Sequence, residues 1–116
     1  MSAWVYILKC SDDSCYTGST VDLHGRIVKH TVGNISSWTA NRLPVKLVFS
    51  QEFCAIDEAF RVERQIKGWS RAKKEALIIS DFDLLVELAK NSKQKEKRAI
   101  LILKKNHRAK QCRKSS

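Results

Sequence analysis

Residues 4–20, WVYILKCSDDSCYTGST, decide the fold. Trp4–Cys10 is an apolar run rich in aromatic and branched side chains, and Cys15–Thr20 is a second short run of strand-favouring residues. Between them lie the turn-forming residues Ser11–Ser14. Two such runs separated by turn formers predict an antiparallel β-hairpin.

The register of this hairpin decides whether its two tyrosines can share a site. Side chains along a strand alternate between the two faces of a sheet. Tyr6 and Tyr16 therefore share a face only when the numbers of paired residues add to an even total, as when Cys10 opposes Tyr16. We predict such a register, closed by a loop of odd length. An odd total, with Cys10 opposite Cys15, would put the phenols on opposite faces.

The segment after the hairpin predicts a helix from Leu23 to Val32. Asp22 is a suitable N-cap, and either Gly33 or Asn34 can supply the left-handed stop.

Two kinds of side chain recur along this helix. Leu23 and Ile27 are expected to form its inward stripe, and Arg26 and His30, four residues apart, lie together beside that stripe. Gly25 costs roughly 1 kcal/mol relative to alanine within a helix. We therefore expect either a close approach at Gly25 or an irregular start to the helix.

The middle of the chain predicts a loop and then a strand. Asn34–Pro44 is polar and irregular, with Trp38 and Arg42 as its large contact-making side chains. Val45–Phe49 is predicted to be a third strand, and the chain continues extended to about Phe53.

Three further helices are expected, each after a capping side chain. They are a helix from the cap Asp57 to Lys67, Arg71–Ile79 after Ser70, and Phe82–Lys90 after Asp81. In the first, the apolar side chains at helical spacing face inward, namely Ala59, Val62 and Ile66. Glu63 lies next to this stripe.

The positive charge is concentrated at the C-terminal end. Residues 92–116 hold ten lysine and arginine side chains and one glutamate, so they carry +9 of the net charge of +10. We expect a domain at residues 1–91 and a basic C-terminal tail at residues 92–116. Such a tail is typical of a segment that binds phosphate backbones, or of a solvated, disordered end. Its run Ala99–Leu103 is too apolar for free solvent, so we expect it to continue a helix or to dock on a surface.

Composition excludes several other classes of protein. No apolar stretch approaches the ~20 residues that span a bilayer, and the N-terminus lacks the pattern of a signal peptide. The four cysteines form no C-x-x-C pair and do not fit zinc spacings, so reduced structural thiols are expected. We expect a cytoplasmic protein that does not associate with membranes.

Taken in order along the chain, these motifs resemble the GIY-YIG nuclease family. The resemblance is carried by residues 5–7 (VYI), residues 16–18 (YTG), the spacing of Arg26 and His30, and residues 58–77, which contain Glu63. More narrowly, the chain is similar to the small stand-alone bacterial members of that family. The resemblance covers residues 3–90 and implies an α+β fold, in which helices flank a three-stranded antiparallel sheet.

The resemblance also implies a role for each matching position. Glu63 would bind one divalent ion, Mg²⁺ or Mn²⁺; Arg26 would steady the scissile phosphate; Tyr6 and Tyr16 are the two signature tyrosines; His30 would lie near the phosphate; and Gly18 is the signature glycine. The implied activity is metal-dependent endonucleolytic hydrolysis of DNA, of use in DNA repair or recombination.

The chemistry of these side chains is compatible with that activity. A divalent ion held by one carboxylate, and otherwise by water and phosphate oxygens, polarises a phosphoryl group. An arginine offers a fork of donors to the charge that builds on the phosphate. A phenol normally titrates near pH 10, so a base at Tyr6 or Tyr16 needs a nearby cation. Arg26, Lys9 or the metal could supply it, and which phenol is the base is left open.

Nucleic acid, and DNA in particular, is the expected partner, with a protein partner left open. Basic side chains near the motifs are candidates to contact its backbone, namely Lys9, Arg42, Lys67, Lys73 and Lys74. The alternative function is a nucleic-acid-binding module with little or no catalysis. Such a module would keep the scaffold and bind mainly through the basic tail. Each site residue also has a purely structural interpretation: Tyr6 as a core residue, Tyr16 as an aromatic on the strand surface, Glu63 as a partner of Lys67 four residues along, and His30 as a cation at the helix end.

Overall fold

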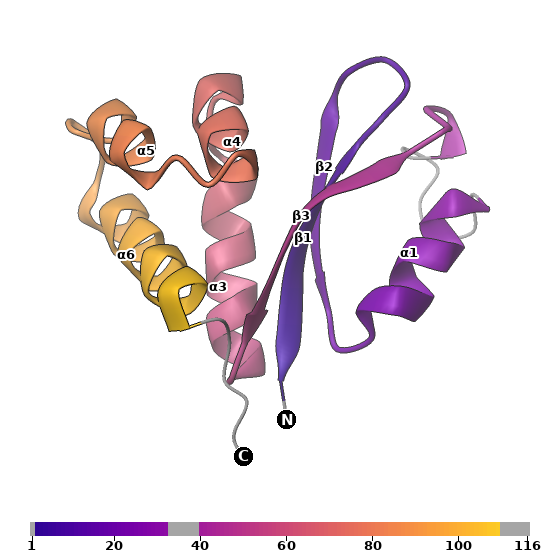
Figure 1. Ribbon diagram of the computed structural model, residues 1–116, viewed down its shortest axis with the longest axis horizontal. Helices are drawn as coiled ribbons and strands as arrows, with labels where there is room; N and C mark the ends of the chain where they lie inside the picture. The colour runs from indigo at the N-terminus through magenta and orange to yellow at the C-terminus, as the bar shows by residue number, and fades with distance from the viewer. Residues whose placement is uncertain (1, 33–39, 110–116) are drawn as a thin grey trace.

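The computed structural model describes residues 2–32 and 40–109. Three strands, β1 (Ala3–Lys9), β2 (Cys15–Thr20) and β3 (Lys46–Phe53), form an antiparallel sheet in the order β2-β1-β3. Helix α1 (Leu23–Thr31) lies on one side of this sheet, and the helices that follow β3 lie on the other (Figure 1). The predicted α+β fold with a three-stranded antiparallel sheet is confirmed.

The β-hairpin has the predicted parity. Pairs run from Trp4 opposite Thr20 to Lys9 opposite Cys15, so paired numbers add to an even total and the two tyrosines share a face. Tyr16 lies opposite Leu8 and not opposite Cys10, a shift of two residues that preserves the parity. The shift arises because the turn uses Cys10 as well, whose N–H donates to the carbonyl of Ser14 at 2.9 Å.

Four helices cover the other face: α3 (Ile56–Lys67), α4 (Arg71–Ile78), α5 (Phe82–Leu88) and α6 (Gln94–Ala109). The predicted caps Ser70 and Asp81 are confirmed, because their side chains accept from backbone N–H groups in the first turns. The prediction that Asp57 caps α3 is wrong, since the helix begins at Ile56 after Ala55. Asp57 lies within the first turn, where an acidic side chain favours the helix dipole.

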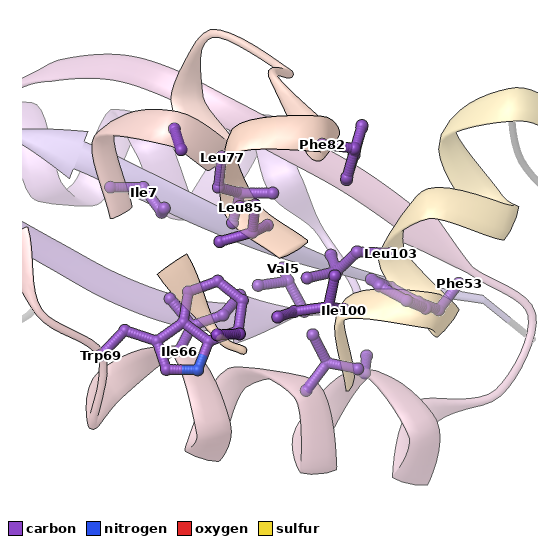
Figure 2. Packing of buried hydrophobic residues seen from close by; sticks show 14 of the residues in the cluster. Val5, Ile7, Phe53, Ile66, Trp69, Leu77, Phe82, Leu85, Ile100 and Leu103 are labelled. Atoms are coloured by element: carbon purple, nitrogen blue, oxygen red, sulfur yellow. The ribbon is translucent and has the colours of Figure 1, made fainter. Parts of the chain in front are cut away.

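The hydrophobic core lies between the sheet and these four helices (Figure 2). Alternation along β1 sends Val5 and Ile7 into it, while Tyr6 points to the opposite face, toward α1. Ala59, Val62 and Ile66 of α3 are buried in this core, as their spacing predicted.

Helix α6 belongs to the same core, which the sequence could not place. Ala99, Ile100 and Leu103 are buried, and the last two are members of the cluster. The ammonium of Lys73 on α4 donates to Ser92 Oγ at 3.1 Å and forms an ion pair with Glu96, which ties the start of α6 to the domain. The run Ala99–Leu103 is therefore part of a helix and also docks on the domain, so both outcomes that the sequence allowed are observed. The division of the chain at residue 91 stays a prediction.

Some predictions fall on residues 33–39, outside the described part. They are the helix stop at Gly33 or Asn34 and the contacts of Trp38; α1 is described to Thr31, with Val32 as its C-cap. Across residues 2–32 and 40–109, every helix is too short or too polar to cross a bilayer.

Candidate active site

Tyr6 is at the centre of the polar face of the sheet. Its side chain is fully buried, and its Oη lies 2.9 Å from Nε2 of His30 on α1. Gly18 is its partner across the ladder, and a Cβ at that position would lie 2.5 Å from Tyr6 Oη. Because no side chain other than that of glycine leaves this space, Gly18 is what allows the phenol to lie across β2.

Burial fixes the protonation of this pair. It raises the pKa of Tyr6 to about 12, against a smaller lowering effect of a hydrogen bond from the Arg26 side chain. Burial, and then the positive charge of Arg26, lower the pKa of His30. Tyr6 is therefore a neutral phenol at neutral pH, and His30 is a neutral imidazole able to accept its proton in a hydrogen bond.

Tyr16 completes an aromatic group on this face. Its ring centroid lies 6.4 Å from that of Tyr6 and 5.0 Å from that of His30. Unlike Tyr6, it is only partly buried. Of the two phenols, Tyr16 is thus the one that solvent reaches.

Helix α1 holds its site residues through its first turn. The Asp22 carboxylate accepts from the Gly25 N–H at 3.1 Å, which confirms the predicted cap. A Cβ on Gly25 would collide with that carboxylate, so the close approach expected at Gly25 is made by the cap itself.

The inward face of α1 differs from the prediction. Leu23 and Ile27 are only partly buried, whereas His30 is fully buried and Arg26 partly so. The reason is that the sheet presents phenols to this helix, and a polar helix face satisfies them better than an apolar stripe.

Glu63 occupies a separate polar position on α3. It is 6% exposed, and its Oε1 accepts from Ser19 Oγ at 2.6 Å. Its Oε2 lies 2.7 Å from Lys67 Nζ, so the pairing at i and i+4 that the sequence allowed is present. Sequence reasoning missed Ser19; the signal was its place directly after Gly18, where alternation turns its side chain toward α3.

Strand β2 separates the two parts of the site. Tyr6, Tyr16, Arg26 and His30 form a group on the α1 face, as predicted, but the contact with Ser19 places Glu63 on the α3 face of the same strand. Since β2 is an edge strand, a ligand at this edge has access to both faces. The charge of Glu63 contributes slightly to raising the pKa of Tyr6, so the two groups are in electrostatic reach.

The candidate nucleic-acid contacts are dispersed. Lys67 is in the site, beside Glu63. Lys9 pairs with Asp13 at 3.3 Å, Arg42 pairs with Asp12 at 3.0 Å, and Lys73 ties α4 to α6, while Lys74 is partly buried on α4.

Lys9 is also not the cation that acts on a phenol. Its odd position on β1 turns it away from the tyrosines, and it lines a hollow against α4 with Ala72 and Ala76. The cation that lowers the pKa of Tyr6 is Arg26.

The oxygen donors at Glu63 fit a hard divalent ion. A carboxylate and the Ser19 hydroxyl are ligands that Mg²⁺ accepts, with water and phosphate oxygens as the rest. Within residues 2–32 and 40–109, no group of three or more histidine, cysteine, aspartate or glutamate side chains could enclose a metal. A divalent ion at this site would thus rest on a single protein carboxylate.

Comparison with known proteins gives the family of the chain. Residues 2–76 match the family model described as the GIY-YIG catalytic domain. The UPF0213 protein BH0048 of Halalkalibacterium halodurans is 45% identical over 78 residues, which is 67% of this chain and 83% of that protein. The UPF0213 protein NP_0776A of Natronomonas pharaonis is 38% identical over 78 residues, 67% of this chain and 92% of that protein.

A solved structure is also similar in sequence. The solution NMR structure of the UPF0213 protein BH0048 from Bacillus halodurans is 45% identical, covers 67% of this chain and 83% of its own, and gives a TM-score of 0.46. The chain belongs to the GIY-YIG family, and its relatives are small UPF0213 proteins of bacteria and archaea. Helices α5 and α6 lie beyond the matched residues.

Proposed function

We propose that this protein is an endonuclease that hydrolyses DNA phosphodiester bonds with one divalent ion, Mg²⁺ or Mn²⁺. The observation that carries the proposal is the meeting of two polar groups at the edge strand β2. One contains Tyr6, Arg26 and His30, and the other contains Glu63 held by Ser19. Both lie within the residues that match a catalytic domain.

Arg26 would bind the scissile phosphate. Its guanidinium is partly exposed on the same face as the phenols, and a fork of donors can meet the charge that grows on the phosphate oxygens. Glu63 would hold the ion, which when bound supplies Lewis-acid polarisation of the phosphate.

Of the two tyrosines, we assign Tyr16 to the attacking water. A general base must come within hydrogen-bond reach of the water that it deprotonates. Tyr6 is fully buried, is bonded to His30, and has a pKa of about 12, so it is poorly placed for that task. Tyr6 instead positions His30 beneath the phosphate site, and Tyr16 lies at the open side of the group.

The second candidate function is a nucleic-acid-binding module with little catalysis. It is favoured by one observation, which is that both oxygens of Glu63 are engaged, one by Ser19 and one by the ammonium of Lys67. If the protein is an enzyme, Lys67 would have to release Glu63 Oε2 so that this oxygen can bind the ion. In a binding module, Lys67 would keep the carboxylate neutralised.

Substitution of the site separates the two functions. Branched, nicked and single-stranded DNA are incubated with Mg²⁺ or Mn²⁺ and the wild type, Glu63→Gln or Arg26→Ala. We expect cleavage by the wild type and a loss of roughly 10²–10³-fold in each variant, as for removal of one charge-stabilising group. Glu75→Gln is the matched control, because Glu75 also pairs with a cation four residues away, Arg71, outside the site.

Two outcomes would contradict the proposal. Cleavage that survives both substitutions would come from a contaminating nuclease. If the wild type cleaves none of the substrates, the second candidate function, a nucleic-acid-binding module, would be favoured. Mn²⁺ binding, followed by electron paramagnetic resonance, tests the ion separately. It should weaken in Glu63→Gln and not in Glu75→Gln.

A further inference from the structure

A groove with basic walls runs between α3 and α6, away from the active site. It measures about 480 Å³ and has Arg61 and Arg64 on the α3 side and Lys95 and Arg98 on the α6 side. Glu58 is its one acidic lining residue among the described residues. Figure 1 shows the two helices side by side on the side of the sheet opposite α1.

Its charge is largely uncompensated. Arg61 pairs with Asp57 at 3.2 Å, but for Arg64, Lys95 and Arg98 the described part of the chain offers no ion-pair partner within 4 Å. Basic side chains that already have acidic partners gain little from an added anion. These three would gain most, because each retains its full charge toward a ligand.

The spacing of the walls suits a phosphate backbone. Arg61 and Arg64, like Lys95 and Arg98, are three residues apart on a helix, which places their Cβ atoms roughly 5–6 Å apart. A duplex strand carries one phosphate about every 3.4 Å of helix axis, and because the strand winds around that axis its successive phosphates are farther apart than this rise, so such a pair can meet neighbouring phosphates. Arginines on both walls can bind phosphate with two donors each.

The floor of the groove is apolar. Val62, Ala99 and Ile102 line it, and Ile102, which is only partly buried, would contact the sugar carbons between phosphates. The groove depends on α6, which lies outside the residues that match the catalytic domain. Helix α6 therefore adds to the domain both a wall and six of the 22 lysine and arginine side chains of the chain.

We propose that this groove is a second nucleic-acid-binding surface, which holds the phosphate backbone of a substrate arm remote from the cleaved bond. The partner class rests on the proposed function, but the surface is separate from the catalytic group. Glu63 lies on the side of α3 that faces Ser19 of β2, whereas the groove lies on the side that faces α6. The substrate that contacts both surfaces has to bend or branch around α3.

The test compares basic side chains that line the groove with basic side chains nearby that do not. Duplex and branched DNA are bound in EDTA, so that cleavage cannot interfere, and the dissociation constant is measured against salt. Affinity falls as salt rises, so the slope of log affinity against log salt is negative. Lys95→Gln with Arg98→Gln should make this slope shallower by about 2, close to 0.9 for each lost phosphate contact. The matched pair Lys93→Gln with Lys97→Gln removes the same charge from exposed positions outside the groove and should change it much less.

Arg64→Gln tests the facing wall and should make the slope shallower by about 1. Equal losses from the Lys95/Arg98 pair and the Lys93/Lys97 pair would show diffuse attraction and overturn the groove, as would unchanged binding in all variants. A loss from Lys95 and Arg98 without one from Arg64 would also overturn it, since α6 would then bind alone. Failure of the proposed function would appear differently, as intact binding with no cleavage when the metal is restored.

Discussion

Val5 and Tyr6 are neighbours on β1, and both are fully buried, but they enter different environments. Val5 joins the apolar cluster beneath α3–α6, where neighbours stabilise one another by area and fit. Tyr6 enters the polar group beneath α1, where its hydroxyl forms a hydrogen bond with His30 and its side chain occupies the space that Gly18, which has no Cβ, leaves open. We therefore expect the first face to tolerate changes that preserve volume and the second to tolerate few changes of any kind.

This difference separates stability from activity. Loss of an apolar side chain in the core removes packing without moving the phenols directly. Loss of a contact on the polar face disturbs the site although it removes little buried area. Substitutions on the two faces should therefore give different ratios of lost stability to lost cleavage.

The largest effect on stability is expected from Leu103→Ala on α6. Leu103 is 1% exposed and belongs to the core cluster, so its truncation should lower the free energy of unfolding by roughly 2–5 kcal/mol. Leu101→Ala, on the same helix at 61% exposure, should change it by less than about 0.5 kcal/mol. Urea denaturation followed by circular dichroism measures both.

Equal midpoints for the two leucine variants would mean that α6 does not dock on the domain. The docked helix also changes how the C-terminal segment should be studied. Deletion of residues 92–116 would remove charge and would also expose the part of the core that packs against Ile100. Point substitutions on α6 are therefore the better way to test the role of its charge.

A smaller loss of stability with a large loss of function is expected from Gly18→Ala. The new Cβ would lie 2.5 Å from Tyr6 Oη, so the phenol must move, at roughly 1–3 kcal/mol. Gly68→Ala is the matched control, because its nearest contact would be the Gln65 carbonyl at an ordinary 3.6 Å. Cleavage that falls equally in both, or in neither, would contradict the role given to Gly18.

The local parts of this fold could be predicted from the sequence. Two strand-favouring runs separated by turn formers in residues 4–20 predicted the hairpin, and the predicted parity of its register, which puts both tyrosines on one face, is confirmed. The caps Asp22, Ser70 and Asp81 were found because a short polar side chain before an apolar period has a direct backbone partner.

Properties that depend on tertiary packing could not be predicted. Helical spacing placed Glu63 beside an inward stripe, but it carries no information on which face of β2 that stripe would meet. The run Ala99–Leu103 gave no period by itself, and only docking distinguishes buried Ile100 from exposed Leu101. The ion pairs of Lys9 and Lys73 likewise depend on distant or loop carboxylates that compete with phosphate.

The smallest effect concerns the pH dependence of the polar face. Burial lowers the pKa of His30, as does Arg26, so the unfolded chain, in which a histidine titrates near 6.5, binds more protons between the two values. The free energy of unfolding should therefore rise with pH up to about 6.5 and then level off. A core substitution such as Leu103→Ala should lower this curve without changing its shape.

His30→Gln should remove that rise, whereas His24→Gln, which replaces an exposed histidine on the same helix, should keep it. The measurement is urea denaturation at intervals from pH 5.5 to 7.5, above the range where carboxylates titrate. Parallel curves for the wild type and His30→Gln would mean that the pKa of His30 is the same in the folded and the unfolded protein. The imidazole would then be open to solvent, and its hydrogen bond to Tyr6 would not be what distinguishes the polar face of β1 from the apolar face.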